Sequence, residues 1–200
     1  MMGLSYKEKD AEKSRRAFQQ FSSPALKKFF GGAVILSTEG HTKDKPTTIE
    51  KSLDISGIDG ICVTQKGWTY FYASRVQFGK LYENFSIRYS RPSGKATEFE
   101  KLQRANKICA PMPTFHVQCF VDDDGQAAVA AIVPTIDLIR HMQKDKLKIR
   151  MTDSGEQFCF IPWRELARVK IYRVDASGHV EEITANFTAD KKIPLFAAAT

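Results

Sequence analysis

The chain has 200 residues and a mass of 22.6 kDa, near the upper edge of one ordinary domain. Its composition, 42% apolar and 26% charged, excludes disordered, collagen-like and coiled-coil proteins. The formal net charge is +7 and is unevenly placed, because residues 1–110 carry 19 Lys and Arg against 11 Asp and Glu, whereas residues 111–200 carry 11 against 12.

Residues 1–31 are predicted to form a helical segment. Apolar residues recur at helical spacing along Lys7–Phe21, which indicates a first, charged helix. Ser23 and Pro24 then resemble an N-cap followed by proline at the first helical position, and Gly31 suits the residue after a helix end. We therefore expect a short second helix from Pro24 to Phe30.

Most of the remaining chain is predicted to be extended, with a polar loop over Thr38–Glu50. Apolar, aromatic and β-branched runs bounded by turn residues are typical of strands. The expected strands are Ala33–Ser37, Ile61–Val63, Trp68–Phe78, Phe85–Arg91, Phe115–Val121, Ala127–Val133, Lys146–Met151, Phe158–Ile161 and, as the last, Val169–Val174.

Three helices are predicted among these strands. Thr97 and Glu100 have the spacing of a capping box, which opens a helix that reaches Ile108. Thr135 is expected to cap a helix that ends near Met142, and a short helix is expected over Trp163–Arg168.

The order of elements predicts an α+β fold, or α/β with a mixed sheet, in a single domain. Its parts are the helical segment 1–31, a mixed-sheet core over 32–175 and a tail over 176–200, and no linker or repeat divides the chain. The longest wholly apolar run, Ala127–Val133, is far shorter than the roughly 20 residues of a membrane span, so we expect no membrane partner. Residues Met1–Arg16 are charged from Lys7 onward and contain no apolar stretch, so we expect no secretory signal there. Four cysteines without a CxxC pair favour free thiols in a reducing, cytoplasmic compartment.

Asp59 and the strand that follows it form the first candidate site. Asp59 stands beside Gly60 at the start of an apolar strand, where the backbone can approach a ligand closely. Alternation along the next strand places Arg75 and Gln77 on one face. A buried guanidinium needs a partner, and Asp59 is the natural candidate.

This layout resembles the PD-(D/E)XK superfamily of restriction-endonuclease-like nucleases, over about residues 5–90. That family has an Asp at the start of one strand, an (E/Q)-x-K pair on the next and often a Glu on a preceding helix, which here would be Glu12. The resemblance implies bound Mg²⁺ that activates water. It implies metal ligands Asp59, Glu98 and Glu12, and catalytic roles for Asp59, Gln77 and Lys80.

The sequence also departs from this family pattern. Arg75 stands where the metal-binding acid belongs, and Gln77 stands where the Lys belongs. Lys80 or Arg88 would then supply the missing cation, and Glu98 or Glu100 the missing acid. A buried ion pair between Arg75 and Asp59 that only holds the sheet together is the alternative interpretation.

A run of cations with interleaved aromatic residues forms the second candidate site. The helical members Lys101, Arg104 and Lys107 recur at i, i+3 and i+6 and form one ridge, which suits phosphate contacts. The predicted nucleic-acid-binding residues are Arg75, Arg88, Arg91, Lys95, Lys101, Arg104 and Lys107. An ordinary solvated helix face is the alternative interpretation.

These observations predict a nucleic-acid-binding protein with a restriction-endonuclease-like core, and whether it is also a Mg²⁺-dependent endonuclease stays open. DNA is preferred over RNA as the ligand. The alternative is a non-catalytic module that binds DNA or an acidic protein through the basic surface. The apolar run from Ile193 to Ala197 would dock on its own domain or on a second copy in a homodimer.

Overall fold

The computed structural model describes residues 6–37, 52–53, 56–144 and 147–183. Two predicted segments, the loop Thr38–Glu50 and the apolar run Ile193–Ala197, lie outside the described residues. Within the described ranges, no helix has the length and apolar character needed to cross a membrane.

Seven strands form the larger sheet, in the order β1-β2-β3-β5-β6-β9-β10. Their bounds are Val34–Ser37 (β1), Gly60–Val63 (β2), Thr69–Phe78 (β3), Phe115–Val121 (β5), Ala127–Pro134 (β6), Lys170–Asp175 (β9) and Val180–Ile183 (β10). Only β3 and β5 run parallel, and the other neighbours are antiparallel. The sheet is therefore mixed, and the predicted α+β fold is confirmed.

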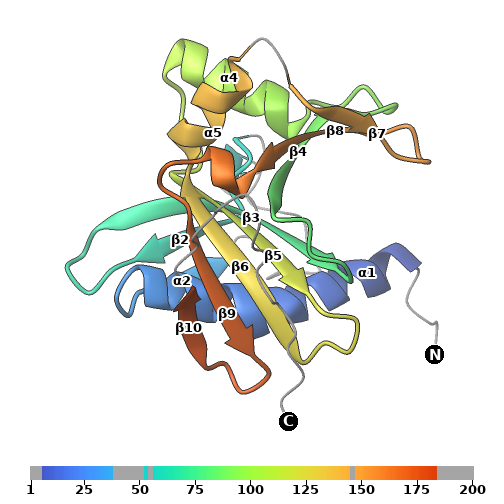
Figure 1. Cartoon of the computed structure of the whole chain (residues 1–200). Coiled ribbons are helices and arrows are strands. Elements are labelled where there is room, and N and C mark those ends of the chain that lie inside the picture. Colours follow the sequence, from blue (N-terminus) through green and yellow to red (C-terminus); the bar gives the residue numbers. More distant parts are fainter. Residues whose placement is uncertain (1–5, 38–51, 54–55, 145–146, 184–200) are drawn as a thin grey trace.

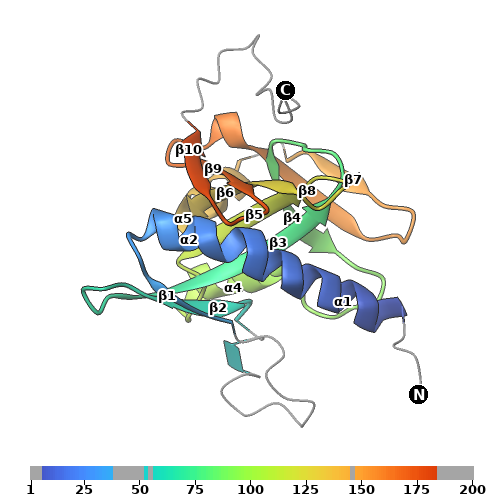
Figure 2. The ribbon, with the colours of Figure 1, turned by 90° about the horizontal axis from the view of Figure 1, so that it is seen from below.

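A second, antiparallel sheet lies over one face of the larger one, in the order β4-β8-β7. Its strands are Asn84–Ser90 (β4), Ile149–Met151 (β7) and Gln157–Pro162 (β8), and a tight turn around residues 153–155 joins the last two. The helices α4 (Glu98–Ile108) and α5 (Thr135–Met142) lie on the same side. Figures 1 and 2 show α1 (Tyr6–Ala17) and α2 (Ser23–Phe29) covering the opposite face.

Each face of the large sheet has its own apolar core. Under α1 and α2, Phe21 and Leu26 pack on Tyr72, Cys119 and Ala130. On the other face, strand residues pack against the small sheet, α4, α5 and the fully buried Trp163. Successive side chains along a strand point to opposite faces of the sheet, so the same strands contribute apolar residues to both cores.

The two N-terminal helices are continuous, which differs from the predicted break at Ser23. A π-helical turn, Phe18–Ser22, joins them, and Ser22 and Ser23 both keep right-handed helical backbone angles. Ser23 N–H bonds to the carbonyl of Phe18, five residues back. The wider turn accommodates Pro24, which has no N–H and would clash with a regular preceding turn. The predicted end is confirmed, since Gly31 adopts φ +67° after Phe30.

Three C-terminal predictions are corrected. Among the described residues, the last strand is β10 rather than the segment Val169–Val174, because a turn after β9 lets Val180–Ile183 pair back on β9. Thr135 is the first residue of α5 and not its cap, because its hydroxyl lies 2.9 Å from His116 Nδ1. The predicted helix Trp163–Arg168 shortens to a 3-10 turn, Trp163–Glu165.

Candidate functional site

Helix α4 follows β4 in the chain, packs against it and carries all three members of the predicted basic ridge. Its capping box is present as predicted, because Thr97 Oγ1 accepts from Glu100 N–H and the Glu100 carboxylate accepts from Thr97 N–H at 2.7 Å. Thr97 Oγ1 also donates to the carbonyl of Tyr89 on β4, at 3.2 Å. The start of α4 is thus fixed both to its own first turn and to the small sheet.

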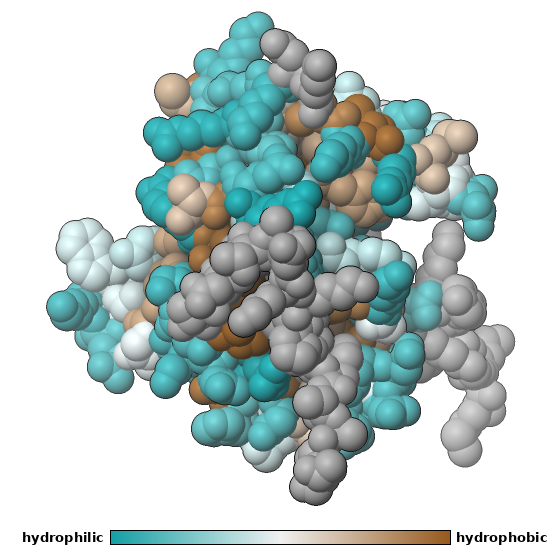
Figure 3. Space-filling view, in the orientation of Figure 1, coloured by the Kyte–Doolittle hydropathy of each residue, from teal (hydrophilic) through white to brown (hydrophobic). Residues whose placement is uncertain are grey.

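A groove of about 870 Å³ lies along α4, between the helix, the loop before it and Ser56. Four of the predicted nucleic-acid-binding residues line it, namely Arg91, Lys95, Lys101 and Arg104. The remainder of the lining includes one acid, Glu100, and apolar groups such as Ile108 and Pro111. Figure 3 shows hydrophilic side chains gathered over the end of the molecule where α4 and α5 lie.

The cations of this groove differ in how firmly they are held. Arg91 donates through Nε to the carbonyl of Lys95 at 2.9 Å and through Nη2 to the carbonyl of Ala96, so it also shapes the loop. Lys95 and Arg104 are exposed. Lys107 is exposed on α4 but lies outside the groove lining, so the predicted ridge contributes two of its three members.

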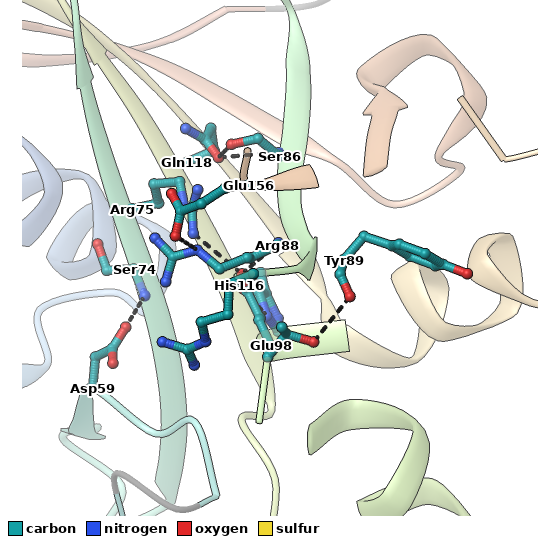
Figure 4. Close-up of polar contacts among 12 residues, drawn as sticks. Asp59, Ser74, Arg75, Ser86, Arg88, Tyr89, Glu98, His116, Gln118 and Glu156 are labelled. Atoms are coloured by element: carbon teal, nitrogen blue, oxygen red, sulfur yellow. Dashed lines mark hydrogen bonds and ion pairs between the residues drawn. The ribbon is translucent and has the colours of Figure 1, made fainter. Parts of the chain in front are cut away.

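Beside the groove, Glu98 contacts three strands and forms the centre of one polar cluster (Figure 4). Its carboxylate lies 3.5 Å from Arg75 Nη2 on β3 and 3.2 Å from His116 Nε2 on β5. It also accepts from the backbone N–H of Arg88 on β4, at 3.4 Å. The cluster therefore ties α4 to both sheets.

Charge and burial act against each other at Glu98. Burial alone would raise the pKa of its carboxyl, but the hydrogen bond from His116 and the charge of Arg75 outweigh burial and lower the pKa to about 2. Burial lowers the pKa of the Arg75 guanidinium, and the charge of Glu98 opposes that change. Glu98 is therefore a carboxylate and Arg75 a cation throughout the neutral range.

Arg75 and Arg88 stack on the ring of Phe158 from β8. Their guanidinium carbons lie 4.9 Å and 5.5 Å from the ring centroid, in the range of cation–π contacts. Arg88 Nε also lies 3.2 Å from a carboxylate oxygen of Glu156. Two of the predicted nucleic-acid-binding residues are thus occupied between the sheets, with about a quarter to a third of each side chain exposed.

Gln77 belongs to a second polar group that also bridges the two sheets. Its side-chain amide donates to Ser86 Oγ on β4 at 3.4 Å. Gln118 on β5 accepts from both the N–H and the hydroxyl of Ser86, at 3.3 Å and 3.2 Å. Arg75 and Gln77 do share a face of β3, as alternation predicts.

Asp59 lies on the other side of β3, so the expected Arg75–Asp59 ion pair is replaced by the pair with Glu98. Asp59 precedes β2 and accepts from the backbone N–H of Ser74 at 2.7 Å. It lines a cavity of about 60 Å³ together with Ser74 and residues of α1. In Figure 4 the strand that carries Ser74 and Arg75 passes between Asp59 and Glu98.

The remaining predicted site residues are also dispersed. Glu12 pairs with Arg16 on the surface of α1, Glu100 is committed to the capping box, and Lys80 Nζ lies 5.8 Å from the ring centroid of Tyr82. The three carboxylates expected to bind Mg²⁺, those of Asp59, Glu98 and Glu12, therefore do not fit a single ion here. In the part of the chain that the structure describes, no group of three His, Cys, Asp or Glu side chains could hold a metal.

Several members of these two polar groups were not among the residues singled out from the sequence: His116, Gln118, Glu156 and Phe158. A usable signal existed in β5, where His116 and Gln118 are polar residues at alternate positions of an otherwise apolar strand. Glu156 and Phe158 carry no comparable signal, because only the pairing of β4 with β8 brings them to Arg88.

No protein family, curated protein or solved structure matches this chain. A functional assignment therefore depends on the geometry of the groove and of the polar cluster.

Proposed function

We propose that the protein is a nucleic-acid-binding module whose ligand lies in the groove along α4. The observation that carries this proposal is the presence of four cationic side chains, Arg91, Lys95, Lys101 and Arg104, around one groove of about 870 Å³. Cations spaced along a groove suit the repeating phosphates of a nucleic-acid backbone.

The rigidity of the groove supports this proposal. The capping box and the bonds from Arg91 fix the loop and the first turn of α4, so the backbone that carries the cations is held in place before a ligand binds. A preorganised site loses less conformational entropy on binding than a flexible one. Sequence-independent contacts of this kind position a nucleic acid without reading its bases.

The test is charge reversal in the groove. The double variant Lys101→Glu/Arg104→Glu should weaken binding of a fluorescent DNA oligonucleotide by at least about tenfold, measured by anisotropy. The slope of log affinity against log salt should also become shallower by about 2, because two phosphate contacts are lost. A matched control, Arg150→Glu/Arg164→Glu, changes the net charge equally at exposed positions outside the groove lining. Equal losses in both double variants would contradict a groove site.

Two other hypotheses, a protein partner and a nuclease activity, are tested with the same protein. An acidic protein that competes with DNA and binds more tightly would assign the groove to a protein partner. Cleavage of DNA or RNA in the presence of Mg²⁺ or Mn²⁺, lost in Asp59→Ala, would favour the Mg²⁺-dependent endonuclease instead of the non-catalytic module.

The cysteines support a cytoplasmic location for this function. Cys62, Cys119 and Cys159 are buried and free, and Cys109 is exposed and free. Burial raises the pKa of Cys119 to about 12, so its thiol stays protonated and unreactive at neutral pH. Free thiols of this kind are typical of reducing compartments.

A further inference from the structure

The β2–β3 hairpin ends in an exposed tryptophan. Trp68 is 64% exposed, whereas the other tryptophan, Trp163, is fully buried. Figure 1 shows this hairpin projecting from the body of the molecule, and Figure 3 shows its tip as a pale protrusion on the left. A large aromatic side chain that packs little on its own protein is available to a partner.

The tip is held in one conformation. Thr64 N–H donates to the carbonyl of Trp68 at 2.9 Å, Gly67 N–H donates to the carbonyl of Thr64 at 2.9 Å, and Trp68 N–H donates to Thr64 Oγ1 at 3.1 Å. Gly67 has φ +79°, which a glycine adopts without strain. The indole is therefore presented by a fixed turn, not by a free loop.

Exposed cations lie on the hairpin turn itself and on the end of the helix that touches the hairpin. Lys66 is exposed beside it on the same turn. The end of α2 touches the hairpin, because a Cβ on Gly32 would lie 2.9 Å from Gln65 Nε2 and Phe30 stacks on Tyr70 at 5.0 Å. Lys27 and Lys28 are exposed in the last turn of that helix.

We propose that Trp68 stacks on an unpaired base of the bound nucleic acid, while the cations beside it contact the flanking phosphates. This inference rests on the proposed function and names its ligand class as single-stranded. An indole has the flat apolar face that base stacking uses, and stacking tolerates any base sequence. In a duplex the base faces are already stacked on one another, so the tip would gain no such contact.

The experiment is a fluorescence titration with a single-stranded oligothymidylate of about 12 nucleotides and with a duplex of equal length. The single strand should quench the emission of the wild-type protein, and the duplex should not. In Trp68→Phe the quenching should vanish, because the remaining Trp163 is fully buried. Affinity for the single strand should fall about five- to tenfold in Trp68→Ala and stay within about twofold in Trp68→Phe, since phenylalanine also stacks.

Met151→Ala is the matched control, because Met151 is a large apolar residue that is 70% exposed on β7. Its affinity for the single strand should equal that of the wild type. Binding that still depends on Lys101 and Arg104 but leaves Trp68 unquenched would overturn this inference and keep the proposed function. Absence of any binding would overturn both. A blue shift with anionic vesicles and no quenching by the oligonucleotide would overturn it in favour of a membrane surface.

Discussion

Glu98 receives contacts from β3, β4 and β5 through Arg75, the backbone of Arg88 and His116. Its side chain is 24% exposed and that of Arg75 is 25% exposed, so both charged groups are largely desolvated. Such a pair stabilises the folded state little compared with a well-packed apolar pair, but removal of one partner leaves the other charge buried without a counter-charge.

Glu98→Gln should therefore lower the free energy of unfolding by about 2–4 kcal/mol, because Arg75 remains buried without its counter-charge. Urea denaturation measures the change. The exposed pair Lys170–Glu182 offers the control, because Glu182→Gln should lower the free energy of unfolding by less than about 1 kcal/mol. The double variant Arg75→Met/Glu98→Leu should recover much of the loss. Similar losses in the two Gln variants would show that Glu98 behaves as a surface charge.

The pH dependence of stability follows from the lowered pKa of Glu98. Its folded pKa of about 2 lies below the ordinary value of 4.5, so its contribution is present above pH 4.5 and is lost as the pH falls toward 2. The difference in unfolding free energy between wild type and Glu98→Gln should be constant near neutral pH and should shrink between pH 4.5 and 2. If the difference between the two proteins grew as the pH fell, the lowered pKa of Glu98 would be contradicted. Urea titrations at several pH values measure it.

At the scale of elements, α4 depends on Thr97, which is buried and serves both its own helix and β4. Thr97→Ala should lower the free energy of unfolding by about 1–2 kcal/mol, since both functions of the hydroxyl are lost. Thr97→Ser keeps the hydroxyl and should lose less than half as much. Chemical denaturation measures both variants, and equal losses would assign the effect to the methyl group instead of the hydroxyl.

Local patterns predicted most elements because they depend on neighbours in the sequence. The capping box of α4, the glycine after α2 and the alternation of β3 all belong to this group. The continuous N-terminal helix was missed because the π turn removes the usual effect of Pro24. Strand β10 was missed because two of its four residues are glutamates, and only pairing with β9 makes it a strand.

The sequence predicted which residues belong to the candidate site better than it predicted the contacts between them. Arg75 and Glu98 were both singled out, and the shared face of Arg75 and Gln77 was correct. The partner of Arg75 was wrong because the sequence does not say on which side of β3 Asp59 lies. His116 reaches Glu98 only because β3 and β5 pair in parallel, with Ala73 opposite His116. That register is a property of the whole sheet.

At the scale of the molecule, the charge asymmetry has a spatial counterpart. All four groove cations belong to residues 1–110, where the net positive charge resides. Residues 111–200 supply most of the sheet core and two acids, Glu156 and Glu165, which pair with Arg88 and with His141 and Lys148. Glu156 thus pairs with a cation from the first 110 residues, whereas Lys95 and Arg104 of the groove are exposed.

The strand order also has a consequence for biosynthesis. Strand β6, composed almost wholly of Ala, Val and Ile, pairs on one side with β5 and on the other with β9. A ribosome completes β6 at residue 134 but supplies its second neighbour only with residues 170–175. During that interval the nascent chain presents an apolar, uncharged strand edge, the feature that most readily recruits other chains into aggregates. Chains terminated before residue 170 would keep this edge open permanently.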